Sequence, residues 1–128
     1  MKTRLIEQIR TSGPMPFDAY MEACLYDPED GFFAAGPVRS GKKGDFVTSP
    51  EISWAFGVPV GEWAEKNMPS DHAVLIEVGA GSGALMEQLY DIWTQYTDPV
   101  YAIERSADAR TRLAAELRDV IVFGSIEE

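Results

Sequence analysis

The stretch that decides the fold is Glu77-Val78-Gly79-Ala80-Gly81-Ser82-Gly83, in the second half of a chain of 128 residues. A nearly continuous apolar run, Ala73–Val78, leads into its glycines, and such a run is typical of a strand buried on both faces of a parallel sheet. Leu85–Trp93 follows with apolar residues at helical spacing. The stretch therefore predicts a strand, a tight glycine turn and a helix whose free N–H groups point at the turn.

The remainder of the chain repeats this alternation. Val100–Ile103 predicts a second strand, Ala107–Leu117 is rich in strong helix formers, and Val120–Phe123 predicts a third strand. A strand–helix–strand–helix–strand order is typical of half of a doubly wound, Rossmann-like α/β fold with a parallel sheet. We therefore predict the first half of such a domain over residues 71–128. Its open sheet edge would be apolar, so we expect a longer protein, a partner or a second copy to cover it.

Residues 1–70 predict a helical and loop-rich segment that packs on this domain. Apolar spacing within Leu5–Ile9 and Phe17–Leu25 predicts two helices. Glycines and prolines then interrupt residues 27–50, and long ordered loops of this kind often carry function.

A third helix is expected to begin with Ser49 as its N-cap, without a full capping box. Gly57 and Pro59 predict a kink or a break in this helix. We expect the tryptophans to pack rather than to contact a ligand; they are Trp54, Trp63 and Trp93.

The glycine turn and Glu104 together predict a site for an adenosine-type ligand. Glu104 lies at the end of the second strand, 21 residues after Gly83, where a carboxylate can accept both hydroxyls of a ribose. The dinucleotide fingerprint places its third glycine one position later, at Ala84 here. A nicotinamide or flavin site therefore stays open as an alternative, and so does a tight turn without any ligand.

Two further groups of residues are candidates for the same site. A glutamate two positions before the first glycine makes the motif similar to motif I of class I methyltransferases that use S-adenosylmethionine. Such enzymes often carry an acidic residue after the third strand to meet the adenine amino group, and here that place is taken by Ser125. The loop before the third helix offers side chains that could reach the cofactor or a substrate; they are Asp45, Phe46, Thr48 and Ser49.

Sequence blocks along most of the chain point to a more specific family. The chain is similar to the MidA family of methyltransferases in four places, Gly13–Phe33, Gly44–Gly57, Glu77–Gly83 and Glu104–Ser106. The resemblance implies S-adenosylmethionine as cofactor and, from the mitochondrial members of the family, methylation of protein arginine side chains for the assembly of respiratory complex I. It also implies a protein roughly two to three times longer than this chain.

The composition excludes several classes of binding partner and site. There are 11 Lys and Arg against 21 Asp and Glu, a net charge of −10, which argues against nucleic acid and against anionic membrane surfaces. No apolar stretch approaches the roughly 20 residues of a membrane helix. Cys24 and His72 are the only residues of their types, so neither a disulfide nor a zinc site is expected. No secretory signal is visible, and the first family block begins near Gly13, so we expect a bacterial, cytoplasmic protein.

These observations predict an S-adenosylmethionine-dependent methyltransferase, or the cofactor-binding fragment of one. The alternatives are half of a nicotinamide or flavin oxidoreductase and a truncated, non-catalytic binding or interaction protein. Class I enzymes commonly place acceptor-binding residues after the fourth strand, and this sequence predicts three strands. Catalytic residues are therefore not assigned. The predicted cofactor-binding residues are Glu77, Gly79, Ala80, Gly81, Gly83, Glu104 and Ser125.

Overall fold

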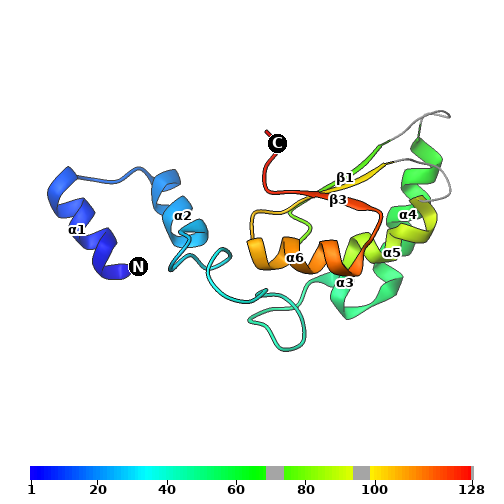
Figure 1. Ribbon diagram of the computed structural model, residues 1–128, viewed down its shortest axis with the longest axis horizontal. Coiled ribbons are helices and arrows are strands. Elements are labelled where there is room, and N and C mark those ends of the chain that lie inside the picture. Colours follow the sequence, from blue (N-terminus) through cyan, green and yellow to red (C-terminus); the bar gives the residue numbers. More distant parts are fainter. Residues whose placement is uncertain (69–73, 94–98, 128) are drawn as a thin grey trace.

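A three-stranded parallel sheet with helices on one face forms the larger part of the molecule (Figure 1). The computed structural model describes residues 1–68, 74–93 and 99–127. The strands are β1 (Leu75–Val78), β2 (Val100–Ile103) and β3 (Val120–Phe123), in the order β1-β2-β3. The predicted alternation of strand and helix is confirmed, and the start of the first predicted strand at Ala73 lies outside the described residues.

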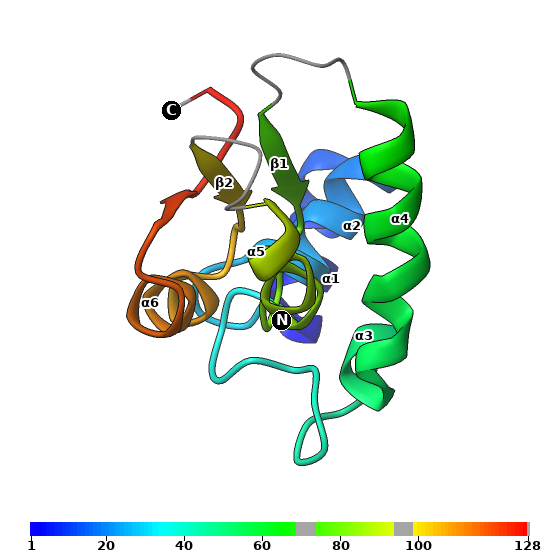
Figure 2. The same ribbon diagram turned by 90° about the vertical axis from the view of Figure 1, so that its right-hand side faces the viewer.

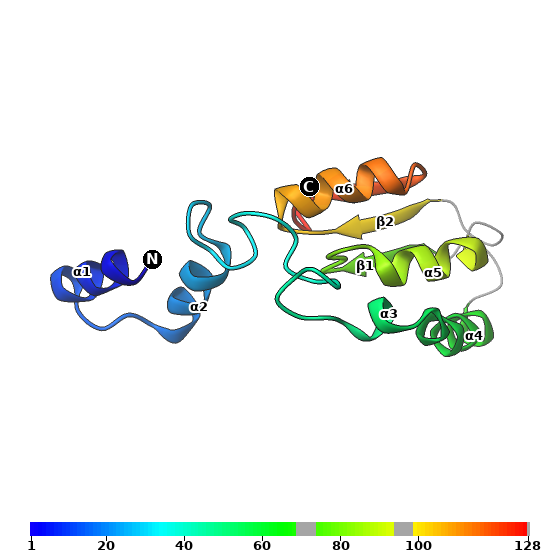
Figure 3. The same ribbon diagram turned by 90° about the horizontal axis from the view of Figure 1, so that it is seen from below.

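Three helices form the layer next to this sheet: two lie on one face of it, and the helix that precedes β1 packs against its neighbour beyond the β1 edge (Figures 2 and 3). They are α4 (Gly57–Asn67), α5 (Ala84–Trp93) and α6 (Ala107–Glu116). Met86 of α5 and Leu113 of α6 are buried against strand residues such as Ala102. This apolar layer fixes the helices against the sheet, while strand pairing sets the register in which the carboxyl ends of the strands lie.

The opposite face of the sheet is not covered by any of the described elements. Strand side chains alternate between faces, and β1 accordingly alternates between half-buried and exposed positions. Ile76 is 54% exposed and Val78 is 66% exposed. The expectation of a strand buried on both faces is therefore wrong for β1, because none of the described elements packs on its second face.

The N-terminal helices lie away from the sheet at one end of the molecule (Figure 1). They are α1 (Lys2–Ser12) and α2 (Phe17–Tyr26), close to the predicted ranges. The loop that follows folds back toward the sheet. Its Phe32 and Phe33 rings lie 4.9 Å apart edge to face, and Phe46 lies 6.4 Å from Phe33. These ring contacts hold distant parts of the long loop together, although Phe32 and Phe46 stay exposed.

The third helix differs from the prediction at its start and at its break. It forms α3 (Ser49–Ile52) and the short 3-10 helix η1 (Trp54–Phe56) before α4. Thr48, not Ser49, is the N-cap of α3, and Glu51 completes a capping box with it. The break falls at Ser53, whose backbone is extended, so Gly57 begins α4 instead of interrupting it.

The tryptophans also depart from expectation. Trp54 is 74% exposed and Trp63 is 69% exposed, so neither packs into the described core, and the side chain of Trp93 lies outside the described part.

In the described ranges, no helix combines the length and the apolar character that crossing a bilayer requires.

Candidate functional site

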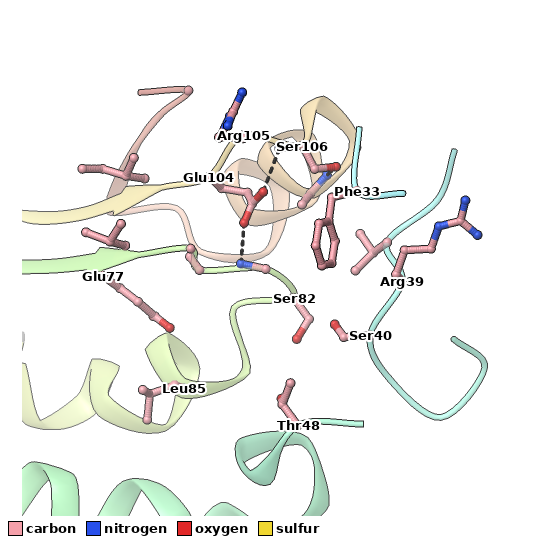
Figure 4. A pocket seen from close by; sticks show the side chains of 18 of the residues that line it. Phe33, Arg39, Ser40, Thr48, Glu77, Ser82, Leu85, Glu104, Arg105 and Ser106 are labelled. Carbon is pink, nitrogen blue, oxygen red and sulfur yellow. Dashed lines mark hydrogen bonds between the residues drawn. The ribbon is translucent and has the colours of Figure 1, made fainter. Parts of the chain in front are cut away.

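A cavity of about 800 Å³ opens at the carboxyl ends of the three strands (Figure 4). One wall is the glycine turn after β1, and a second is the end of β2 with the start of α6. A third comes from the N-terminal segment, including Phe33, Arg39 and Thr48. Residues that are far apart in the sequence therefore meet at the place where open α/β sheets bind their ligands.

The glycine turn brings backbone close to the cavity. Gly79 has φ 74° and Gly81 has φ 55°, the left-handed region that favours glycine. A Cβ placed on Gly79 would meet no atom within 4 Å, so the space beside the turn is free for a ligand. Gly83 has a packing role instead, because the absence of a side chain there lets α6 approach the turn. A Cβ there would lie 2.5 Å from Leu113 Cδ2, and Gly83 does not line the cavity.

Glu104 holds two parts of the site together. Its Oε2 accepts a hydrogen bond of 2.8 Å from the Gly81 N–H, and its Oε1 accepts one of 2.7 Å from the Ser106 N–H (Figure 4). The sequence predicts only a ribose contact for Glu104, and it does not predict these two hydrogen bonds from backbone N–H groups. Each carboxylate oxygen can accept a second hydrogen bond, so Glu104 can still receive two hydroxyl groups while it fixes the turn.

Glu77 is the buried carboxylate of the site. It extends from β1 toward the start of α5 (Figure 4), where the Met86 N–H donates to it. Its Oε2 is buried with no hydrogen-bond partner in the described part of the chain. Burial raises the pKa of Glu77 to about 7. A ligand that brought a hydrogen-bond donor or a positive charge would satisfy this oxygen.

The other predicted residues divide into two groups. Phe46, Thr48, Ala80 and Ser125 line the cavity, whereas Asp45 and Ser49 do not. Asp45 forms an ion pair with Arg39 at 3.3 Å, and Ser49 is the exposed first residue of α3. The structure therefore brings most of the predicted residues to one cavity and leaves Asp45, Ser49 and Gly83 outside it.

Some residues at the cavity escaped the sequence analysis. Ser82 lies in the turn and donates to Glu51 at 2.7 Å. Arg105 follows Glu104 and stacks its guanidinium on the Tyr26 ring, 3.7 Å from the ring centre. The spacing Thr48-x-x-Glu51 is the capping-box signature, and it could have identified Glu51 from the sequence. Nothing in the sequence pairs Arg105 with helix α2.

The chemistry of the lining suits an adenosine-type ligand with an amino-acid tail. Glu104 can take hydroxyls, Glu77 has an unsatisfied buried oxygen, and the turn offers close backbone contact. Within the described ranges, no group of three or more His, Cys, Asp or Glu side chains is placed to hold a metal ion.

No protein-family model matches the chain. Among curated proteins, it is 37% identical over 98 residues to "Protein arginine methyltransferase NDUFAF7 homolog, mitochondrial" of Drosophila melanogaster. It is 31% identical over 116 residues to the protein of the same name from Caenorhabditis elegans, and 34% identical over 99 residues to human "Protein arginine methyltransferase NDUFAF7, mitochondrial". These matches cover 73%, 83% and 74% of this chain. The chain spans only 22% to 27% of the length of these relatives.

Solved structures give the same fold. A COG1565 superfamily member and likely methyl transferase from Burkholderia thailandensis, bound to S-adenosyl-homocysteine, superimposes with a TM-score of 0.80 at 26% identity. The match covers 96% of this chain and 36% of that one. A second structure of an uncharacterised COG1565 protein from the same organism gives a TM-score of 0.73. The predicted methyltransferase-type α/β fold is thereby confirmed.

The expectation of a bacterial, cytoplasmic protein is contradicted. The curated relatives described above are animal proteins named as mitochondrial. The expectation rested on where the printed sequence begins relative to the first family block, and this carries no information about the compartment.

Proposed function

We propose that this chain, a homologue of the MidA-family (COG1565) methyltransferases, is the S-adenosylmethionine-binding part of a protein methyltransferase. The observation that carries the proposal is the shared cavity of the glycine turn and Glu104. It occurs in a fold that matches a structure bound to S-adenosyl-homocysteine over 96% of the chain.

The proposed contacts follow from the chemistry of each group. The carboxylate of Glu104 accepts the two ribose hydroxyls through its remaining lone pairs. The amino group of the methionine moiety lies on the side of Glu77, whose buried oxygen lacks a partner. Gly79, Ala80 and Gly81 let the ligand approach the backbone closely. Ser125 meets the edge of the adenine with its hydroxyl, in place of the acidic residue common in class I enzymes.

S-adenosylmethionine, when bound, supplies a methyl group that its sulfonium charge has already activated. During transfer a nitrogen–carbon bond forms, the sulfur–carbon bond breaks and the sulfur becomes neutral, while the acceptor nitrogen loses a proton to a base or to water. The chain contributes by holding the cofactor, orienting it and excluding water. We propose a protein arginine side chain as acceptor, on the names of the relatives, and assign no catalytic residue.

The N-terminal segment has a supporting role in this proposal. We assign residues 1–70 to a segment that forms one wall of the cavity, and residues 71–128 to the first half of the cofactor domain. Phe46 and Thr48 are on the cavity and would contact the cofactor or the substrate. Asp45 and Ser49 would act only through the shape of the loop. The relatives' names support a mitochondrial rather than a cytoplasmic location.

Calorimetric titration of the purified chain with S-adenosylhomocysteine and, separately, with NADH tests the proposal. We expect S-adenosylhomocysteine to bind and NADH not to bind. The Glu104→Ala variant should lose at least about tenfold in affinity, because it removes two hydrogen bonds to a charged acceptor. Glu62→Ala, on the exposed side of α4, is the matched control. Binding of NADH alone would establish the dinucleotide alternative instead.

A further inference from the structure

Glu51 connects the two walls of the cavity. Its Oε2 accepts hydrogen bonds from the Thr48 N–H at 2.8 Å and from the Thr48 hydroxyl at 2.9 Å. Its Oε1 accepts from the Ser82 hydroxyl at 2.7 Å. Ser82 lies 31 residues away in the sequence, between two glycines of the turn. A single carboxylate therefore joins the loop wall to the glycine turn.

The partners of Glu51 lie on the cavity itself. Thr48 and Ser82 both line it, and their side chains face each other across its lower part (Figure 4). Glu51 does not line the cavity, so it acts on a ligand only through these neighbours. A role confined to capping α3 would need Thr48 but not Ser82.

The electrostatics keep Glu51 charged. Burial by itself would raise its pKa, but the donors from Thr48, Ser82 and Ser40 outweigh burial and lower the pKa to about 2. The bonds are therefore made to an anion at all ordinary pH values, and charge-assisted hydrogen bonds are about twice as strong as neutral ones.

We propose that Glu51 is a positioning residue for the cofactor: through Ser82 it holds the glycine turn, and through Thr48 it holds the loop wall against that turn. The proposal rests on the proposed function, since it concerns the binding of the same cofactor. A turn with three glycines loses much conformational freedom when it is ordered. An anchor that orders it before the ligand arrives reduces the cost of binding.

A double-mutant cycle on S-adenosylhomocysteine affinity tests this role in the full chain. Ser82→Ala and Glu51→Ala should each weaken binding about tenfold, as expected for a lost hydrogen bond to a charged group. The double variant should also be about tenfold weaker, not a hundredfold, because both changes remove the same link. Thermal unfolding without ligand is measured in parallel, and Glu62→Ala should leave the affinity unchanged.

The outcomes separate the possibilities. Additive losses would show that Ser82 acts on the ligand by itself and Glu51 only caps α3, and unchanged affinity in either single variant would overturn the proposal directly. If Glu51→Ala fails to fold, Ser82→Ala still decides, because it leaves the capping box intact. Its ligand-free hydrogen exchange at residues 79–83 should be faster than in the parent chain, and equal exchange would overturn the proposal. Failure of the parent chain to bind S-adenosylhomocysteine would instead remove the proposed function.

Discussion

Two carboxylates at the site illustrate how their surroundings set their charge. Glu51 is surrounded by donors, which lower its pKa to about 2. Glu77 is buried with a single backbone donor, and burial raises its pKa to about 7. Near neutral pH, Glu51 is therefore fully ionised, while Glu77 is divided between its two forms. At the scale of single residues, Glu51 is thus an anion at every ordinary pH, whereas Glu77 titrates close to physiological pH.

The raised pKa of Glu77 predicts a dependence of stability on pH. The unfolded chain has the ordinary value of 4.5 and releases this proton first. The contribution of Glu77 to stability is therefore fully present below about pH 4.5 and is lost as the pH rises through about 7. The free energy of unfolding should fall by about 3 kcal/mol over this range because of Glu77.

Urea unfolding at a series of pH values from about 4 to 8 checks this. Glu77→Gln should remove the fall, because an amide does not ionise, whereas Glu62→Gln should keep it. If Glu77→Gln and the parent chain have the same dependence on pH, the assignment of this pKa to burial of Glu77 is incorrect.

The sequence predicts some of the contacts at the site, and it does not predict others. The glycine turn and Glu104 have a fixed spacing in the sequence, so their meeting at one cavity was predicted. The bond between Glu51 and Ser82 depends on how α3 docks beside the turn, which no local pattern encodes. The N-cap was misplaced by one residue for a simpler reason, because Thr48 and Ser49 are both good caps and only the partner Glu51 separates them.

At the scale of elements, a cluster of Arg105, Glu22 and Tyr26 attaches α2 to the end of β2. The Arg105 guanidinium donates to Glu22 through both of its terminal nitrogens, with Nη1 3.0 Å from Oε2. The same guanidinium stacks on Tyr26. Arg105 directly follows Glu104 in the sequence, so this cluster ties the N-terminal helices to the mouth of the cavity.

The Glu22→Ala variant should loosen α2 without unfolding the chain. The Arg105 and Glu22 side chains are 49% and 58% exposed, and exposed pairs contribute at most about 1 kcal/mol. We expect a small change in the unfolding midpoint but several-fold faster hydrogen exchange at residues 17–26. Glu7→Ala, on the exposed side of α1, is the control. Unchanged exchange in Glu22→Ala would mean that other contacts hold α2 in place.

The predictability of the elements follows from the range of the forces involved. Strands and helices with strong periodicity were located correctly, and this includes α2, which has no buried residue. The break at Ser53 was not, because it depends on Gln88 of α5. That side chain accepts from the Gly57 N–H at 2.8 Å and donates to the Pro50 carbonyl at 2.7 Å. It holds both sides of the break.

At the scale of the whole molecule, the uncovered sheet face is the dominant feature. Register places Ile76, Tyr101 and Ile121 side by side across the three strands. Val78, Ile103 and Phe123 form the next row on the same face. β1 pairs only with β2 in the described sheet, so its outer edge has unpaired backbone groups. Apolar faces and open edges of this kind favour association.

We predict that the isolated chain self-associates through this face. A lysine at position 76 would place a charge in an apolar contact, so Ile76→Lys should weaken association at least about tenfold. Phe17→Lys changes a residue that is 75% exposed on α2 and should have little effect. Sedimentation equilibrium over a range of concentrations measures both. A chain that stays monomeric at every concentration, or equal effects of the two lysines, would contradict the prediction.

The measurement that tests the central claim most directly is a crystal structure of the chain with S-adenosylhomocysteine. The account predicts the ligand in the cavity at the carboxyl ends of the strands. Its ribose hydroxyls should lie within hydrogen-bond distance of the Glu104 carboxylate, and its amino group on the side of Glu77. A ligand bound elsewhere, or a ribose that does not contact Glu104, would contradict the account.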